Sequence, residues 1–251
     1  MRIVSDKIAR RARWILGSIT GAALIAGAVR LRARRSSGQP DVPADVGFMR
    51  ALHAALRRDL FRLRDAVTQL DNSTAAPPTV LAGWDAFRAQ LDNHHSAEDD
   101  ELWPMLRREL SDPGDLAAVD AMVEEHRHIP PALADVDAAL RGTGELTAPV
   151  EHLSAIVLDH LAHEEREVLP LIEQHLTRAQ WRAFLHTERA RRSPRERPEF
   201  LTWILDNAGP QDTAAVLTEM PPPARLIYRG VLQPRYDAQR RWQIPSPPAK
   251  T

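Results

Sequence analysis

Four long segments of the chain carry apolar residues at intervals of three and four, which places those residues on one face of an α-helix. The first segment, for example, has Leu52, Leu56, Leu60 and Leu63 among charged neighbours. Stretches rich in Pro, Gly, Asp and Ser separate the segments. Because short connections make consecutive long helices antiparallel, the pattern predicts an all-α fold, an up-down-up-down four-helix bundle. The four segments are residues 49–70, 79–110, 119–140 and 153–172.

The same polar motif interrupts the apolar stripes of the second and fourth segments. His94 is followed by Glu98, and His160 is followed by Glu164, so each pair is one helical turn apart. Side chains at i and i+4 share a helix face, and each motif therefore offers one imidazole and one carboxylate to the same point. The repeated motif predicts a pseudo-symmetric bundle whose interior holds both pairs.

The first and third segments each add one histidine to this buried surface, His53 and His126. A single histidine in such a stripe is more often a hydrogen-bonded core residue. Six unpartnered polar groups, however, cost roughly 2–7 kcal/mol each when buried, and a bound metal satisfies all of them together. The predicted metal ligands are His53, His94, Glu98, His126, His160 and Glu164.

The composition limits which metal the chain could bind and which classes of protein it could belong to. The 251 residues include no Cys, which excludes disulfides, thiolate zinc sites and sulfur-bound clusters. A ligand set of His and carboxylate suits iron or manganese better than zinc. The formal net charge of −1 gives no reason to expect a nucleic-acid partner.

Polar residues beside the predicted ligands have simpler interpretations. His95 and His163 lie one position off the apolar stripe, so we expect them outside the metal site. Asp99 and Glu165 each follow a predicted ligand directly. Two interpretations of these acids stay open: they accept hydrogen bonds from ligand imidazoles, or they are solvated surface groups.

The beginning of the chain differs from the rest. An uncharged run from Trp14 to Val29 has arginines on both sides. As a helix it would span roughly 24 Å, slightly less than the hydrocarbon core of a bilayer at about 30 Å. We interpret it as a single membrane anchor, with a cleaved signal peptide and a soluble or interfacial helix as alternatives. The denser arginines after the run favour a cytoplasmic main domain, either anchored or soluble.

These patterns predict three parts of the chain. Residues 1–40 form an apolar helix and a linker, residues 41–190 the four-helix bundle, and residues 191–251 a helical appendage. The appendage is expected to contain short helices near 200–206 and 225–232 and a disordered end. We find no motif of known chemistry in it.

The order His…His-x-x-x-Glu…His…His-x-x-x-Glu resembles that of the hemerythrin-like (HHE cation-binding) family. The resemblance covers residues 45–175, and the phrases His-His-x-x-Glu-Asp from His94 and Leu-Trp-Pro from Leu102 are similar to those of bacterial members. It implies a bundle around two non-haem irons joined by an oxo or hydroxo group. In that centre the four histidines are terminal ligands, while Glu98 and Glu164 bridge the irons.

One departure from the family changes the expected chemistry. Oxygen-carrying hemerythrins have a fifth histidine one turn after the third-helix histidine, and that position is Pro130 here. The resemblance then implies one vacant position on each iron. This favours binding of O₂, NO or peroxide for sensing, scavenging or redox protection over oxygen carriage. Three alternatives stay open: an oxidase- or catalase-like enzyme acting on peroxide, an iron or redox sensor that controls contacts with a protein partner, and a purely structural bundle.

Overall fold

The computed structural model of this protein describes residues 42–70, 75–220, 225 and 227–244. The chain divides into two compact units, Met1–Val42 and Pro43–Thr251, and the second holds nearly all of the described residues. Every regular element in the described part is a helix, apart from an isolated bridge between Pro43 and Thr177. The prediction of an all-α fold is confirmed.

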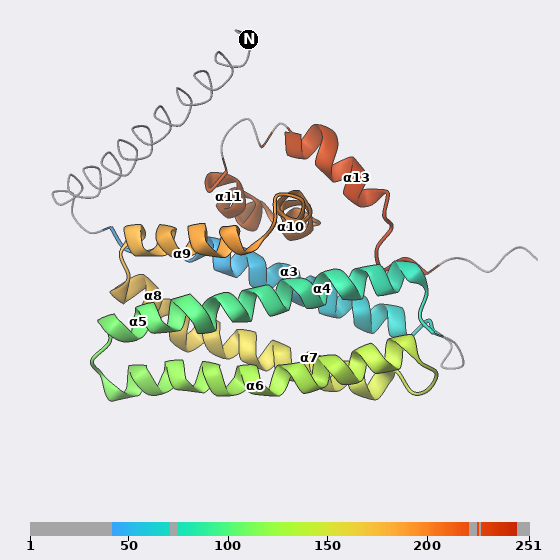
Figure 1. Cartoon of the computed structure of the whole chain (residues 1–251), viewed down its shortest axis with the longest axis horizontal. Helices are drawn as coiled ribbons and strands as arrows, with labels where there is room; N and C mark the ends of the chain where they lie inside the picture. Colours follow the sequence, from blue (N-terminus) through green and yellow to red (C-terminus); the bar gives the residue numbers. More distant parts are fainter. Residues whose placement is uncertain (1–41, 71–74, 221–224, 226, 245–251) are drawn as a thin grey trace, which may run out of the picture. The chain divides into compact units, whose positions relative to one another are not determined.

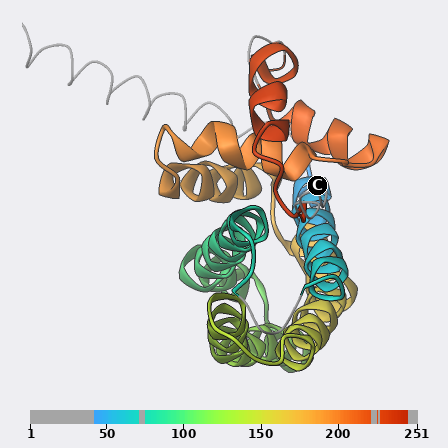
Figure 2. The same cartoon turned by 90° about the vertical axis from the view of Figure 1, so that its right-hand side faces the viewer.

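Four helical rods lie side by side in the second unit (Figures 1 and 2). Their elements are α3 (Gly47–Val67), α4 (Pro78–Ala97), η1 (Glu98–Leu102), α5 (Trp103–Glu109), α6 (Pro113–Arg141), α7 (Thr147–His163), η2 (Glu164–Val168) and α8 (Leu169–His175). Helices α3 and α6 each form one rod, whereas α4 and α7 continue through a π-helical turn into α5 and α8. Because α3 contacts α4 and α7, and α6 contacts the same two helices, the rods enclose a common core.

Each π-helical turn begins at a predicted metal ligand, Glu98 in η1 and Glu164 in η2. The residue that follows each turn donates its amide to the carbonyl of that glutamate, five positions earlier. A proline comes next in both rods, Pro104 and Pro170. Proline has no N–H, and its ring crowds the carbonyl four residues before it, so it disfavours the regular α-helical pattern at this place. Single π turns of this kind are frequent at functional sites.

The apolar core consists of two clusters of buried side chains, and the predicted ligands lie where one cluster gives way to the other. Along α3, Met49 belongs to one cluster and Leu56 to the other, and His53 lies between them. The same change occurs across His126 in α6. The polar side chains therefore form a layer across the core, with apolar packing on both sides.

A group of shorter helices follows the bundle. They are α9 (Arg178–Arg191), α10 (Glu196–Leu205), α11 (Pro210–Thr218), η3 (Tyr228–Leu232) and α13 (Gln233–Asp237). Helix α9 contacts α4, and α10 and α11 contact α3, so the group covers one side of the bundle (Figure 2). The indole N–H of Trp203 in α10 donates to Asp59 of α3 over 2.7 Å, and both side chains are buried. This bond fixes the group to the bundle.

Two predictions concern segments that the structure does not describe. The apolar run at residues 14–29 and the expected disordered end at residues 245–251 both lie outside the described residues. Among the residues that are described, none of the helices has the length and apolar character needed to cross a membrane.

Candidate metal centre

The six side chains predicted as metal ligands meet in the middle of the core, and at most 6 % of any of them is exposed. They come from all four rods: His53 from α3, His94 from α4, Glu98 from η1, His126 from α6, His160 from α7 and Glu164 from η2. His53 Nε2 lies 3.2 Å from an oxygen of Glu164, and His94 Nδ1 lies 3.3 Å from an oxygen of Glu98. The structure thus brings together every residue that the sequence pattern selected.

The donor atoms form two groups, each of which can hold one cation. Within a group, one ligand atom from each of four residues lies within 4.8 Å of the others, and all members are buried. Glu98 belongs to both groups, so its two oxygens can join two cations. Group one is His53, His94, Glu98 and Glu164, and group two is His95, Glu98, His126 and His160.

His95 is the residue that sequence reasoning missed. The expectation that it lies outside the site was wrong: it is 8 % exposed, and its ring stacks on that of His126. At about 100° per residue, Glu98 lies about 40° from His94 and about 60° from His95 around the helix axis. One carboxylate therefore stands between two imidazoles, and a search for His at both i−3 and i−4 of Glu98 would have found His95.

Three of the imidazoles are held by carboxylates at the nitrogen that points away from the groups. The pairs, each with Nδ1 and oxygen 2.9 Å apart, are His53 with Glu165, His126 with Asp99 and His160 with Glu125. An ionised carboxylate can only accept, so each Nδ1 carries a proton, and in the neutral imidazole each Nε2 has a lone pair that can bind a metal. Asp99 and Glu165 therefore accept hydrogen bonds from imidazoles, the first of the two interpretations left open by the sequence.

His126 and His160 present their Nε2 atoms to each other. Their Nε2 atoms lie 3.2 Å apart in the buried core. Because both Nδ1 atoms donate to carboxylates, both Nε2 atoms present lone pairs to each other. When both imidazoles are neutral these lone pairs repel, and either a proton shared between the two Nε2 atoms or a metal ion bound to both relieves the repulsion.

Other atoms of the two groups also need a partner. Buried polar atoms in proteins are nearly always hydrogen-bonded. Within the described part of the chain, both oxygens of Glu98 and of Glu164, and Nε2 of His53, His94 and His95, make no hydrogen bond. Leaving such atoms unpaired costs about 1–3 kcal/mol each, and more where the group is charged. All of these atoms are nitrogen or oxygen donors of the kinds that bind iron, so the residues fit a metal centre.

The pKa values of the two central carboxylates diverge in the metal-free protein. Burial and the nearby charge of Glu164 raise the pKa of Glu98 well above its ordinary value. Burial would also raise the pKa of Glu164, but the charge of His53, whose Nε2 lies 3.2 Å from a Glu164 oxygen, outweighs burial and lowers this pKa. Two adjacent buried carboxylates cannot both ionise easily without a neighbouring cation. A bound metal supplies that charge.

The outer carboxylates are strongly acidic. Burial alone would raise the pKa of Glu165, but hydrogen bonds from His53 and Arg57 lower it to about 2. Burial likewise opposes ionisation of Glu125, and hydrogen bonds from His160 and His163 outweigh it and lower its pKa. These acids are thus fully ionised near neutral pH, which keeps the imidazole protons on Nδ1.

The comparison with family models agrees with this geometry. The model described as the hemerythrin HHE cation binding domain matches residues 44–172. Neither the curated proteins nor the solved structures include a match to this chain. The matched range covers just over half of the chain and contains every residue of both donor groups. The chain belongs to the hemerythrin HHE cation-binding domain family.

Proposed function

We propose that this protein is an up-down-up-down four-helix hemerythrin-like protein whose two irons bind a small molecule, O₂, NO or peroxide, for sensing, scavenging or redox protection. The observation that carries the proposal is the pair of donor groups joined at Glu98, in which seven buried nitrogen and oxygen atoms make no hydrogen bond among the described residues. A pair of irons, when bound, supplies electrons and an open coordination position. The residues of the chain orient the ligands and exclude water.

The proposed centre has fewer open positions than the two that the resemblance implied. In the proposed centre, His53 and His94 bind one iron, and His95, His126 and His160 bind the other. Glu98 would bridge the irons, and Glu164, whose oxygens are buried and make no hydrogen bond, would be the second bridge. With one shared oxo or hydroxo group, the iron bound by three imidazoles would be fully coordinated. A single open position then remains, on the iron bound by His53 and His94.

His95 thus replaces the histidine that Pro130 does not provide. Pro130 lies inside α6, one turn after His126, and has no ligating atom. The nitrogen would come instead from His95 of α4, whose ring stacks on the ring of His126. This arrangement restores an asymmetric centre, and it makes reversible binding of a small ligand compatible with the geometry.

The proposal is tested by loading the full-length protein with iron, reducing it and mixing it with O₂ in a stopped-flow spectrometer. We expect a new absorption band that forms rapidly and persists, because buried apolar clusters pack on both sides of the donor residues and exclude water. A band that decays with continued consumption of peroxide would favour the enzyme alternative. An unchanged spectrum in a protein shown to contain two irons would contradict ligand binding.

A further inference from the structure

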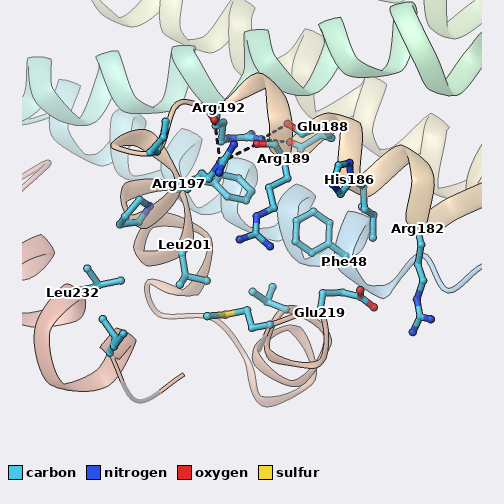
Figure 3. Close-up of a pocket in the computed structure, with 17 residues that line it drawn as sticks. Phe48, Arg182, His186, Glu188, Arg189, Arg192, Arg197, Leu201, Glu219 and Leu232 are labelled. Atoms are coloured by element: carbon cyan, nitrogen blue, oxygen red, sulfur yellow. Dashed lines mark hydrogen bonds and ion pairs between the residues drawn. The ribbon is translucent and has the colours of Figure 1, made fainter. Parts of the chain in front are cut away.

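A cavity of about 520 Å³ lies among α9, α10, α11 and η3, away from the candidate metal centre (Figure 3). Binding sites for small molecules in proteins have volumes of about 300–1,000 Å³. Among the described residues that line the cavity, Phe48 alone lies within the range matched by the family model. The other lining residues come from the C-terminal part of the chain, so nearly all of the cavity wall lies outside the range matched by the family model.

Most of the cavity wall is apolar. Phe48, Leu201 and Leu232 line it from three different elements (Figure 3). Val216 of α11 and Met220, two residues after the end of α11, also line it. A wall of this kind binds an apolar body, because transfer of apolar surface out of water is favourable by roughly 25 cal/mol per Å².

The α9 side of the cavity is basic. Four arginines and two glutamates line the cavity, so positive charge is in excess. Two of the arginines are already occupied: Arg192 pairs with Glu188 and lies over the ring of Phe200, and Arg197 donates to backbone carbonyls. The four arginines are Arg182, Arg189, Arg192 and Arg197, and the glutamates are Glu188 and Glu219.

The other two arginines are free to bind a ligand. Within residues 42–70, 75–220, 225 and 227–244, neither Arg182 nor Arg189 has an ion pair or a side-chain hydrogen bond. Arg189 extends from α9 into the cavity, above the apolar floor (Figure 3). A guanidinium presents its N–H groups as a fork that matches a carboxylate or a phosphate. The cavity therefore combines an apolar wall with the guanidinium of Arg189, which can bind an anion.

We propose that this cavity binds an amphipathic anion, a molecule with an apolar body and one carboxylate or phosphate headgroup. The apolar body lies between Phe48, Leu201 and Met220, and the headgroup pairs with Arg189. Cationic amphiphiles are excluded by the excess of arginine, and neutral ones leave Arg189 without a partner. The inference does not depend on the metal centre, because Arg189 and most of the wall lie outside the matched domain.

Calorimetric titration of the iron-loaded, full-length protein tests this inference. The probes are dodecanoate and dodecyl phosphate, which carry the two headgroups, with dodecanol and dodecylammonium as neutral and cationic controls. We expect one equivalent of each anion to bind, at least about tenfold more tightly than either control, since only the anions can make charge-assisted hydrogen bonds to Arg189. Acetate and inorganic phosphate, which lack the apolar body, are expected not to bind measurably.

A matched pair of variants separates the cavity from general surface charge. Arg189→Gln should weaken binding of both anions by about tenfold or more. Arg178→Gln changes an exposed arginine of the same helix that does not line the cavity, and it should leave the affinity unchanged. Leu201→Trp, checked for unchanged helicity by circular dichroism, should block the apolar space and abolish binding.

Three results would overturn the inference. The first is that neither dodecanoate nor dodecyl phosphate binds. The second is that dodecanol binds as tightly as the anions, or that Arg189→Gln and Arg178→Gln behave alike. The third is sedimentation with phosphatidylglycerol vesicles in the absence of binding to either monomeric anion, which would indicate a membrane surface in place of a single bound molecule. If only one anion binds, the headgroup is identified as a carboxylate or a phosphate.

Discussion

The ring of His95 stacks on the ring of His126, with centroids 4.1 Å apart and planes inclined by 26°. The two residues come from α4 and α6. In the proposed centre this stacking brings the nitrogen of His95 to the iron that is also bound by His126 and His160. The position one turn after His126 in α6 is Pro130, so the neighbouring helix supplies the nitrogen that α6 does not.

This relationship predicts that His95→Ala weakens iron binding strongly. Loss of a group that only orients a ligand typically costs roughly 10–100-fold in metal affinity, and loss of a ligand should cost more. His163→Ala is the matched control, because His163 also lies one position off the stripe but contacts only the outer carboxylate Glu125. Competition with a chelator of known affinity measures the iron affinity of both variants. Equal affinities for the two variants would refute His95 as a ligand.

The acidity of Glu165 gives a prediction about pH. Its pKa in the folded protein is about 2, below its ordinary value of 4.5. The ionised group therefore stabilises the metal-free fold fully above pH 4.5, and this contribution disappears as the pH falls toward 2. The difference between the two pKa values corresponds to at most about 3 kcal/mol.

Urea unfolding of metal-free Glu165→Gln should accordingly show a loss of about 2–3 kcal/mol at neutral pH, with the difference from the unaltered protein shrinking below pH 4.5. Glu167→Gln is the control: Glu167 is nearly half exposed and pairs only with its neighbour Arg166, so its removal should change little. A loss for Glu165→Gln that is independent of pH would show that charge is not its cause.

Two buried tryptophans offer a test of how the C-terminal helices are attached. Trp203 donates to Asp59, whose side chain is 1 % exposed, and Trp84 donates to Asp137, whose side chain is 26 % exposed. Replacement of either tryptophan by Phe removes the indole N–H that donates to the aspartate. At Trp203 the buried acceptor loses a partner that water cannot replace, and we expect a loss of about 1–3 kcal/mol beyond that for Trp84→Phe.

Chemical unfolding of Trp203→Phe and Trp84→Phe in the metal-loaded protein measures this difference. Both substitutions remove a similar apolar area from fully buried positions, so the comparison isolates the hydrogen bond. A larger loss at Trp84 would show that attachment of α10 to α3 does not depend on Asp59.

The sequence predicted the helices and six of the donor residues because both follow from the same periodicity. His53, His126 and the two His-x-x-x-Glu pairs lie in apolar stripes, and the helical repeat alone directs them inward. His95 was missed because the stripe was treated as one narrow face. A centre with two cations is wider than that, and it accepts side chains on both sides of Glu98.

Features that depend on contacts between helices could not be derived in this way. Glu125 is close to His160 only because α6 and α7 pack together, and their separation in sequence is 35 residues. The C-terminal cavity depends on how several short helices meet. Short helices owe their arrangement to tertiary packing more than to their own sequence.

The number of irons bound per chain tests the central claim, that two groups joined at Glu98 hold two cations. Metal-free protein is titrated with ferrous iron under anaerobic conditions, and bound iron is counted by elemental analysis after gel filtration. We predict two irons for the unaltered protein and for His163→Ala, and fewer than two for Glu98→Ala. Retention of two irons by Glu98→Ala, or a single iron in the unaltered protein, would contradict the account.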